Sequence, residues 1–167
     1  VDIADDRSGP WQPAELKSLV LPDNHGWLRA VFSLPVSGLT ETSPPLALYL
    51  SGTFSARVLW NGQEVGQKGE PAISGEQETP GPVDAVIYLP ANVLQPGNNT
   101  AMIELSSHFR QDSLNSILHG SDALPGLRLA SYSAEVRRPI GYYAVPFLVF
   151  ALLGVTALVI LRTHVYE

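Results

Sequence analysis

The sequence predicts an antiparallel β-sandwich followed by a single transmembrane α-helix. Apolar and polar residues alternate in several short segments, as they do in strands that turn one face toward a core. Glycine and proline, with 14 residues each, separate these segments and mark many turns. Near the end of the chain an uncharged apolar run covers residues 140–161, which is close to the roughly 20 residues that a helix needs to cross a bilayer.

These patterns divide the chain into five segments. Residues 1–26 are an N-terminal arm, in which residues 16–22 are a candidate edge strand. Residues 27–136 form the predicted sandwich, and residues 137–139 form a proline-containing joint before the membrane. The predicted transmembrane helix covers residues 140–161, and a short polar tail covers residues 162–167.

The first strands of the predicted sandwich have one aliphatic face each. In residues 27–35 the aliphatic face carries Leu28 and Phe32, and Trp27 and Arg29 lie on the other face. Residues 46–50 place three leucines together, with Tyr49 opposite. In residues 54–60 the apolar face ends at Trp60, and Arg57 lies on the other face. Period-two alternation therefore predicts which side chains enter the core.

A tight hairpin follows residue 60. Asn61-Gly62 predicts a two-residue type I′ turn, because asparagine and glycine tolerate the positive φ angles that this turn requires. Such a turn pairs Trp60 with Gln63, Leu59 with Glu64, and Val58 with Val65. Trp60 is either a stacking platform for a sugar or a plug in the core. Its position on the apolar face favours the core.

Three more strands are predicted at residues 83–90, 101–105 and 127–136. Long loops rich in glycine or polar residues precede the first and the last of them, at residues 66–82 and 106–126. The strand at 127–136 leads almost directly into the predicted membrane helix. A sandwich joined in this way would lie close to the bilayer.

The apolar run at 140–161 has the flanks of a membrane span. Tyr142 and Tyr143 stand near one end, where interfacial aromatic residues belong, and arginines lie on both sides of the run. A fully buried terminal helix is the alternative, although such a helix normally shows a polar face. We expect that an export signal preceded Val1 and was either removed or left out of this sequence. This places the helix in a bacterial inner membrane, with residues 1–139 in the periplasm or extracytoplasmic space.

Charge and composition exclude several classes of function. The net charge is −6, and the sequence has no basic stripe, which argues against a nucleic-acid partner. It has no cysteine, and therefore no disulfide framework, thiolate metal site or cysteine nucleophile. Neither the histidines at 108 and 119 with Asp112 nor the acidic loop at 75–78 matches a metal-binding motif. We predict no enzyme activity, no cofactor and no metal, since the sequence also lacks a nucleophile elbow, a P-loop and a dinucleotide fingerprint.

Two groups of residues are candidates for ligand binding. The first lies on the strand faces opposite the aliphatic rows, where aromatic rings and planar hydrogen-bonding groups could contact a carbohydrate or another small molecule: Trp27, Arg29, Tyr49 and Arg57. The second lies in one loop, where an extended backbone would put three side chains on one face: His108, Arg110 and Asp112. The alternative is that the first group packs against loops or a partner and that the second is a solvated loop.

Three stretches, in this order, resemble the galactose-binding-like jelly-roll domains: "WLRAVFSLP", "LALYLSGTFSARVLWNGQEVG" and "IYLPANVLQPGNNTAMIEL". The resemblance covers roughly residues 10–135 and implies a jelly-roll topology. Sugar-binding domains of β-galactosidases and β-glucuronidases are similar. With the apolar run that follows, the chain is most similar to extracytoplasmic sensor domains of bacterial seven-transmembrane receptors, which implies a downstream signalling domain or a protein partner.

The resulting hypothesis is a membrane-anchored sensor that couples the binding of a small molecule, carbohydrate or protein to its helix. The alternative is a structural subunit of an envelope or membrane complex, which docks partner proteins and has no small-molecule ligand. An accessory domain of a carbohydrate-active enzyme is a third hypothesis, and the membrane run argues against it.

Overall fold

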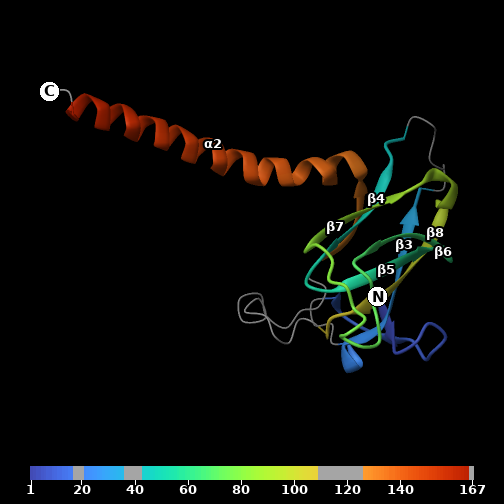
Figure 1. Cartoon of the computed structure of the whole chain (residues 1–167). Coiled ribbons are helices and arrows are strands. Elements are labelled where there is room, and N and C mark those ends of the chain that lie inside the picture. The colour runs from blue at the N-terminus through green and yellow to red at the C-terminus, as the bar shows by residue number, and fades with distance from the viewer. Residues whose placement is uncertain (17–20, 36–42, 109–125, 166–167) are drawn as a thin grey trace. The chain divides into compact units, whose positions relative to one another are not determined.

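A computed structural model describes residues 1–16, 21–35, 43–108 and 126–165 (Figure 1). The chain forms two compact units, Val1–Tyr132 and Ser133–Glu167. The first unit contains all the described strands, and the second is helical.

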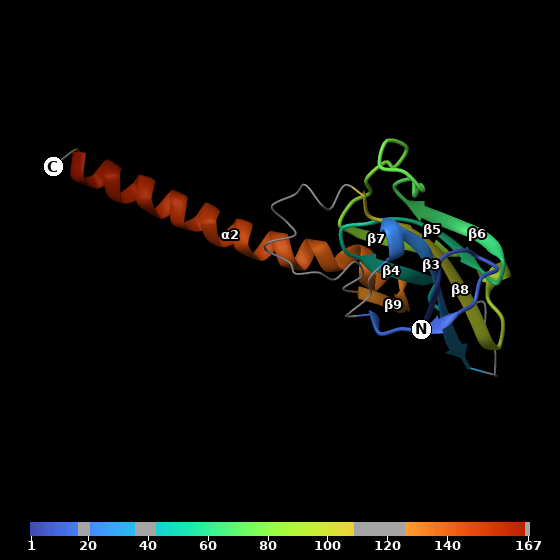
Figure 2. The ribbon, with the colours of Figure 1, turned by 90° about the horizontal axis from the view of Figure 1, so that it is seen from below.

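Two antiparallel sheets make up the first unit (Figures 1 and 2). The larger sheet has the order β2-β1-β3-β8-β5-β6, with the bounds Gln12–Pro13, Asp2–Ala4, His25–Leu34, Gly97–Ser106, Ser55–Trp60 and Gln63–Lys68. The smaller sheet has the order β7-β4-β9, with the bounds Asp84–Leu89, Leu46–Ser51 and Gly126–Ser131. Two 3-10 turns lie at Pro22–Asn24 (η2) and Ala91–Val93 (η3). The predicted antiparallel β-sandwich is confirmed.

The core lies between the two sheets and contains the aliphatic rows predicted from alternation. Leu28, Val58 and Ile103 come from the larger sheet, and Leu48 and Leu50 come from the smaller one. All five side chains are fully buried. Burial of these apolar surfaces is the main favourable term in folding.

Trp60 is a core residue, as predicted. Its side chain is fully buried and its ring stacks on Phe32, with 5.4 Å between the ring centroids. The indole Nε1 donates a hydrogen bond to Oδ1 of Asn99 over 3.2 Å, which satisfies the only polar atom of the ring. Asn99 is itself fully buried.

The hairpin after Trp60 confirms most of the predicted register. Asn61 and Gly62 both have positive φ, at 50° and 87°, and Trp60 pairs with Gln63 and Leu59 with Glu64. The pairing of Val58 with Val65 was wrong, because Val58 pairs with Gly66 across a register shift between Val58 and Leu59. A β-bulge of this kind adds one residue to one strand.

The last predicted strand is shorter than expected. Strand β9 ends at Ser131, and the helix α2 covers Tyr132–Val165 instead of starting at residue 140. Ser131 pairs with Leu46, the first residue of β4, so the ladder has no partner beyond it. The preceding Pro45 accepts a final hydrogen bond from the backbone of Tyr132 over 2.8 Å and cannot donate one. Glu135 in the first turn of α2 suits the positive end of the helix dipole.

In the second unit the structure describes the helix α2 from Ser133 onward. Its segment Tyr132–Arg162 is long and apolar enough to cross a membrane, and none of its most apolar window is buried. The joint predicted at residues 137–139 is part of this helix.

Candidate functional site

The outer face of the six-stranded sheet gathers three of the predicted ligand-binding residues. Strand pairing sets Trp27 of β3 opposite Glu104 of β8, and Glu104 opposite Arg57 of β5. The next row on the same face runs from Arg29 through Met102 to Leu59. Since neighbouring strands lie about 4.8 Å apart, each row spans about 10 Å. We call this array the Glu104 face (Trp27, Arg29, Arg57, Leu59, Met102 and Glu104).

Glu104 is the centre of this face. His25 Nε2 lies 3.2 Å from its Oε1, and Arg57 Nη1 lies 3.2 Å from its Oε2. The side chain of Glu104 is only 14% exposed, whereas that of Arg57 is 41% exposed. The Oε2 atom is fully buried, and its contact with Arg57 is an ion pair without good hydrogen-bond geometry. The carboxylate therefore pairs with one terminal nitrogen of the Arg57 guanidinium, and much of the Arg57 side chain stays accessible.

Arg29 is held in a similar way at the other end of the face. Its Nε and Nη2 both donate to Oδ2 of Asp2 in β1, over 3.1 and 2.8 Å. The guanidinium lies over the ring of Trp11, 4.7 Å from the ring centroid, in a cation–π contact. Trp11 and Trp27 are both half-buried. The N-terminal segment thus adds an aromatic ring and a carboxylate beside the sheet.

In a third row of the same face, two serines lie under a loop. Strand pairing sets His25 opposite Ser106, and Ser106 opposite Ser55. Both serines are fully buried. The Ser55 hydroxyl donates to the carbonyl oxygen of Thr79 over 2.9 Å, and the Ser106 hydroxyl donates to Oε1 of Glu78 over 2.6 Å.

His108 belongs to this covered end. Its backbone N–H donates to Oε2 of Glu78 over 2.7 Å, and its Nε2 lies 3.1 Å from the carbonyl oxygen of Ala72. Its contacts are therefore structural, between the end of β8 and the loop. Arg110 and Asp112, which were predicted to act with it, lie outside the described residues.

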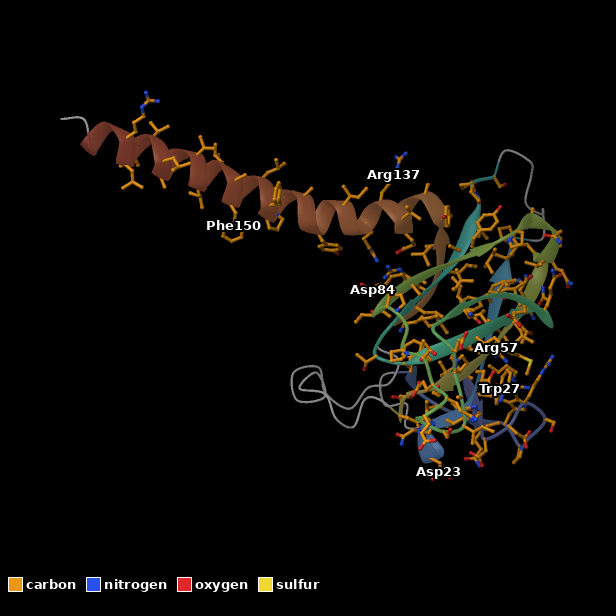
Figure 3. All side chains as sticks on the ribbon, viewed as in Figure 1. Asp23, Trp27, Arg57, Asp84, Arg137 and Phe150 are labelled. Atoms are coloured by element: carbon orange, nitrogen blue, oxygen red, sulfur yellow. The ribbon has the colours of Figure 1, made fainter. Side chains whose placement is uncertain are left out.

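Tyr49 does not join the other candidates. It lies on the outer face of the three-stranded sheet, where its hydroxyl donates to Oδ1 of Asp84 over 2.7 Å. The guanidinium of Arg128 in β9 lies 3.9 Å from the centroid of its ring. Partial burial raises the pKa of the Tyr49 hydroxyl above its ordinary value of 10.0. Figure 3 labels Asp84 on this sheet, and Trp27 and Arg57 on the other.

Sequence reasoning missed several polar residues with defined contacts. Glu104 was predicted only to be the polar residue of an alternating strand, and His25 and Trp11 were not among the predicted ligand-binding residues.

Lys68 is a further polar residue that the sequence did not single out. It lies at the end of β6 and is buried. Its amine lies 3.4 Å from the centroid of the Phe54 ring and donates to the carbonyl oxygen of Gly52. Burial lowers the pKa of its amine from 10.5 to about 7, and Asp84 partly opposes this shift.

Among the residues that the structure describes, no three histidine, aspartate or glutamate side chains are grouped so that they could hold a metal ion. Neither the family models nor the curated proteins contain a match to this chain.

Similar solved structures are glycoside hydrolases. A β-D-mannosidase from Dictyoglomus thermophilum is 13% identical over 72% of this chain and 16% of its own, with a TM-score of 0.47. A β-D-glucuronidase from the same organism is 13% identical over 63% of this chain and 18% of its own, with a TM-score of 0.44. A β-glucuronidase from Ruminococcus gnavus in complex with D-glucuronic acid is 15% identical over 60% of this chain and 17% of its own, with a TM-score of 0.40.

The chain therefore spans less than a fifth of the length of these three enzymes. Likenesses this distant assign neither a family nor a function.

Proposed function

We propose that this chain is a membrane-anchored, non-catalytic binding module whose Glu104 face binds a carbohydrate or a similar polyhydroxylated small molecule. The observation that carries the proposal is the array itself. One sheet face combines a half-buried tryptophan with two arginines, each fixed by its own carboxylate.

The chemistry of the array suits a sugar ring. Such a ring has an apolar C–H surface, which packs on an aromatic face, and hydroxyl groups, which need directional partners. Trp27 provides the aromatic surface, and Arg57 keeps N–H groups accessible at the other end of the same row. Both arginines are oriented by ion pairs, so little side-chain entropy is lost on binding.

The charge balance of the face favours a neutral ligand. Arg29 is paired with Asp2, and Arg57 is paired with Glu104. An acidic sugar would have to compete with these carboxylates for the guanidinium groups, whereas a neutral hydroxyl can accept from the N–H groups that remain.

The wider role in this proposal is that of an extracytoplasmic sensor. The helix α2 would anchor the sandwich in a bacterial inner membrane, with the first unit in the periplasm and a partner protein or downstream domain receiving the signal. Support comes from the three ordered motifs that resemble galactose-binding-like jelly rolls and from the length and composition of α2. On this basis we also propose the jelly-roll topology.

The test is a binding titration with the whole chain in detergent micelles. Neutral saccharides such as galactose, lactose and cellobiose are compared with glucuronate by isothermal titration calorimetry. We expect binding of a neutral saccharide, weakened about 5- to 30-fold by Trp27→Ala or Arg57→Ala, which corresponds to about 1–2 kcal/mol. Tyr49→Ala is the matched control, because Tyr49 is an aromatic residue on the other sheet. Equal weakening by Tyr49→Ala, or preferential binding of glucuronate, would contradict the assignment.

A second candidate function is docking of a partner protein. On the outer face of the three-stranded sheet Tyr88 and Tyr132 are 47% and 36% exposed and form an edge-to-face pair with centroids 5.4 Å apart. Exposed aromatic residues of this kind are enriched in protein interfaces. This function would be favoured if no saccharide gave a binding signal in the titrations and if a partner protein co-purified with the unsubstituted chain but not with the Tyr88→Ala variant.

A further inference from the structure

Residues 70–79 form a closed loop, which we call the strap. Its ends are joined by two backbone hydrogen bonds, from Glu70 N to Thr79 O over 2.8 Å and from Thr79 N to Glu70 O over 3.0 Å. Compact loops with adjacent ends, the Ω-loops, frequently carry function. The strap is thus a compact loop whose two ends are held together by backbone hydrogen bonds.

The two ends of the strap pass through a narrow neck of glycines. Gly69 has a φ of 65°, and a Cβ atom there would lie 2.2 Å from the carbonyl oxygen of Thr79. A Cβ atom on Gly81 would lie 2.6 Å from the carbonyl carbon of Lys68. Only glycine allows the two chain segments to come this close.

The strap covers two serines in the row that adjoins the Glu104 face. Its contacts reach Ser55 and Ser106, which belong to the row next to Trp27, Glu104 and Arg57. The backbone N–H of Ala72 also donates to the Ser106 hydroxyl over 3.1 Å. These contacts bury two hydroxyl groups that would otherwise extend the polar surface of the face.

Few buried apolar contacts hold the strap in place, and most of its attachment is by hydrogen bonds. Within it only Pro71 and Glu78 are buried, and Ile73 is 80% exposed. The Glu78 carboxylate uses both oxygens, one for Ser106 and one for His108. Segments with few buried apolar contacts open at a lower free energy than the core. The Glu78 carboxylate thus makes two charge-assisted hydrogen bonds from the strap to the end of β8.

We propose that the strap is a hinged cover, latched by Glu78, whose release exposes the His25–Ser106–Ser55 row and so lengthens the Glu104 face for a longer polyhydroxylated ligand. The identity of that ligand rests on the proposed function, but the opening of the strap does not. When the strap opens, the hydroxyls of Ser55 and Ser106 lose Thr79 and Glu78 as acceptors and become available to ligand hydroxyls.

Single-cysteine labelling tests the opening directly, because the natural sequence contains no cysteine. Ser55→Cys places a thiol under the strap, and Ala56→Cys places one in the core, on the next residue of the same strand. Each variant of the whole chain, in detergent micelles, is treated with iodoacetamide. We expect Ser55→Cys to react at least about tenfold faster than Ala56→Cys, since local opening is more frequent than global unfolding. Equal slow rates would overturn the proposal.

The latch is tested by adding Glu78→Gln to each reporter. Removing the charge weakens two charge-assisted hydrogen bonds, so labelling of Ser55→Cys should accelerate at least about fivefold, while labelling of Ala56→Cys should not change. Glu76→Gln is the matched control, because Glu76 is an exposed glutamate on the same strap and should have no effect. Acceleration at both reporters would show that Glu78 stabilises the whole sandwich, and would contradict a local latch.

Two further measurements keep the test decisive. If Ala56→Cys does not fold, Ala101→Cys, also fully buried in the core, replaces it. Ser55→Cys itself alters one strap contact, so amide hydrogen exchange of the unmodified chain provides an independent readout. The amide of Ala72 should exchange at least about tenfold faster than that of Ile103. No saccharide is present in either experiment, so a failure of sugar binding leaves their outcome unaffected.

Discussion

Replacing Lys68 with methionine is expected to change how the stability of the sandwich depends on pH. The amine of Lys68 is buried over the Phe54 ring, and burial lowers its pKa from 10.5 to about 7. Such a shift means that the charged amine disfavours the folded state by on the order of 5 kcal/mol. Methionine fills a similar volume and carries no charge.

The direction of the effect follows from proton binding. Between pH 7 and 10.5 the unfolded chain keeps a proton on Lys68 that the folded chain has lost. The free energy of unfolding of the unsubstituted protein therefore rises with pH across this window, and the penalty is fully present below pH 7. Lys68→Met lacks this contribution. The difference in stability between the two proteins should change by about 4 kcal/mol from pH 7 to pH 10.

Urea denaturation of the whole chain in detergent micelles, followed by tryptophan fluorescence at several pH values, measures this difference. Below pH 7 the Lys68→Met variant should be the more stable protein. Lys17→Met changes the net charge by the same amount and serves as the control. Stability curves for Lys68→Met and the unsubstituted protein that stay parallel within about 1 kcal/mol from pH 7 to pH 10 would refute the reasoning.

Three further substitutions test the packing. Trp60→Ala should lower the free energy of unfolding by about 3–5 kcal/mol in urea denaturation, because it leaves a cavity beside Phe32, and a loss below about 1 kcal/mol would contradict the core assignment. Asn99→Asp should cost about 2–4 kcal/mol at pH 7, since the Asn99 amide nitrogen donates to two carbonyl oxygens that a carboxylate would repel, and an unchanged urea midpoint would disprove this. Gly69→Ala should open the strap and speed iodoacetamide labelling of Ser55→Cys; an unchanged rate would show that the neck tolerates a side chain.

Local patterns in the sequence predicted the faces of the strands well. The alternation around Leu28 in β3 and around Val58 and Trp60 in β5 identified the core side of these two strands, because a strand of this kind must turn its apolar face inward. The Asn61-Gly62 turn was also predictable, since few residue pairs accept two positive φ angles. The bulge beside Val58 was not, because the sequence does not show that Gly66, the partner of Val58, lies against Ile87 of the other sheet.

The composition of the candidate site depends on pairing between distant strands. Trp27 and Arg57 were selected without knowledge that Glu104 would lie between them. Tyr49 has the same pattern in its own strand, yet β4 pairs with β7 and β9, which places it on the other sheet. Alternation gives the face of a residue within its strand, but not the sheet that the strand joins.

The sequence did not predict that polar residues in and beside the strap would be buried. Glu78 and Lys68 occur in a glycine-rich stretch that looks solvated, yet both are buried beside the place where the backbone at Gly69 and Gly81 comes close together. The start of α2 at Tyr132 could not be predicted from the sequence, for a different reason. Residues 132–136 continue an alternating pattern, and only the end of the partner strand β4 shows that the ladder must stop.

Fluorine NMR of the whole chain labelled with fluorotryptophan tests the central claim most directly. The chain has three tryptophans, of which Trp27 lies on the Glu104 face, Trp11 beside it, and Trp60 in the core. Titration with a neutral saccharide should shift the Trp27 resonance, and the Trp60 resonance should stay in place. A saccharide that binds and shifts none of the tryptophans, or shifts Trp60 as strongly as Trp27, would contradict a binding site on this face.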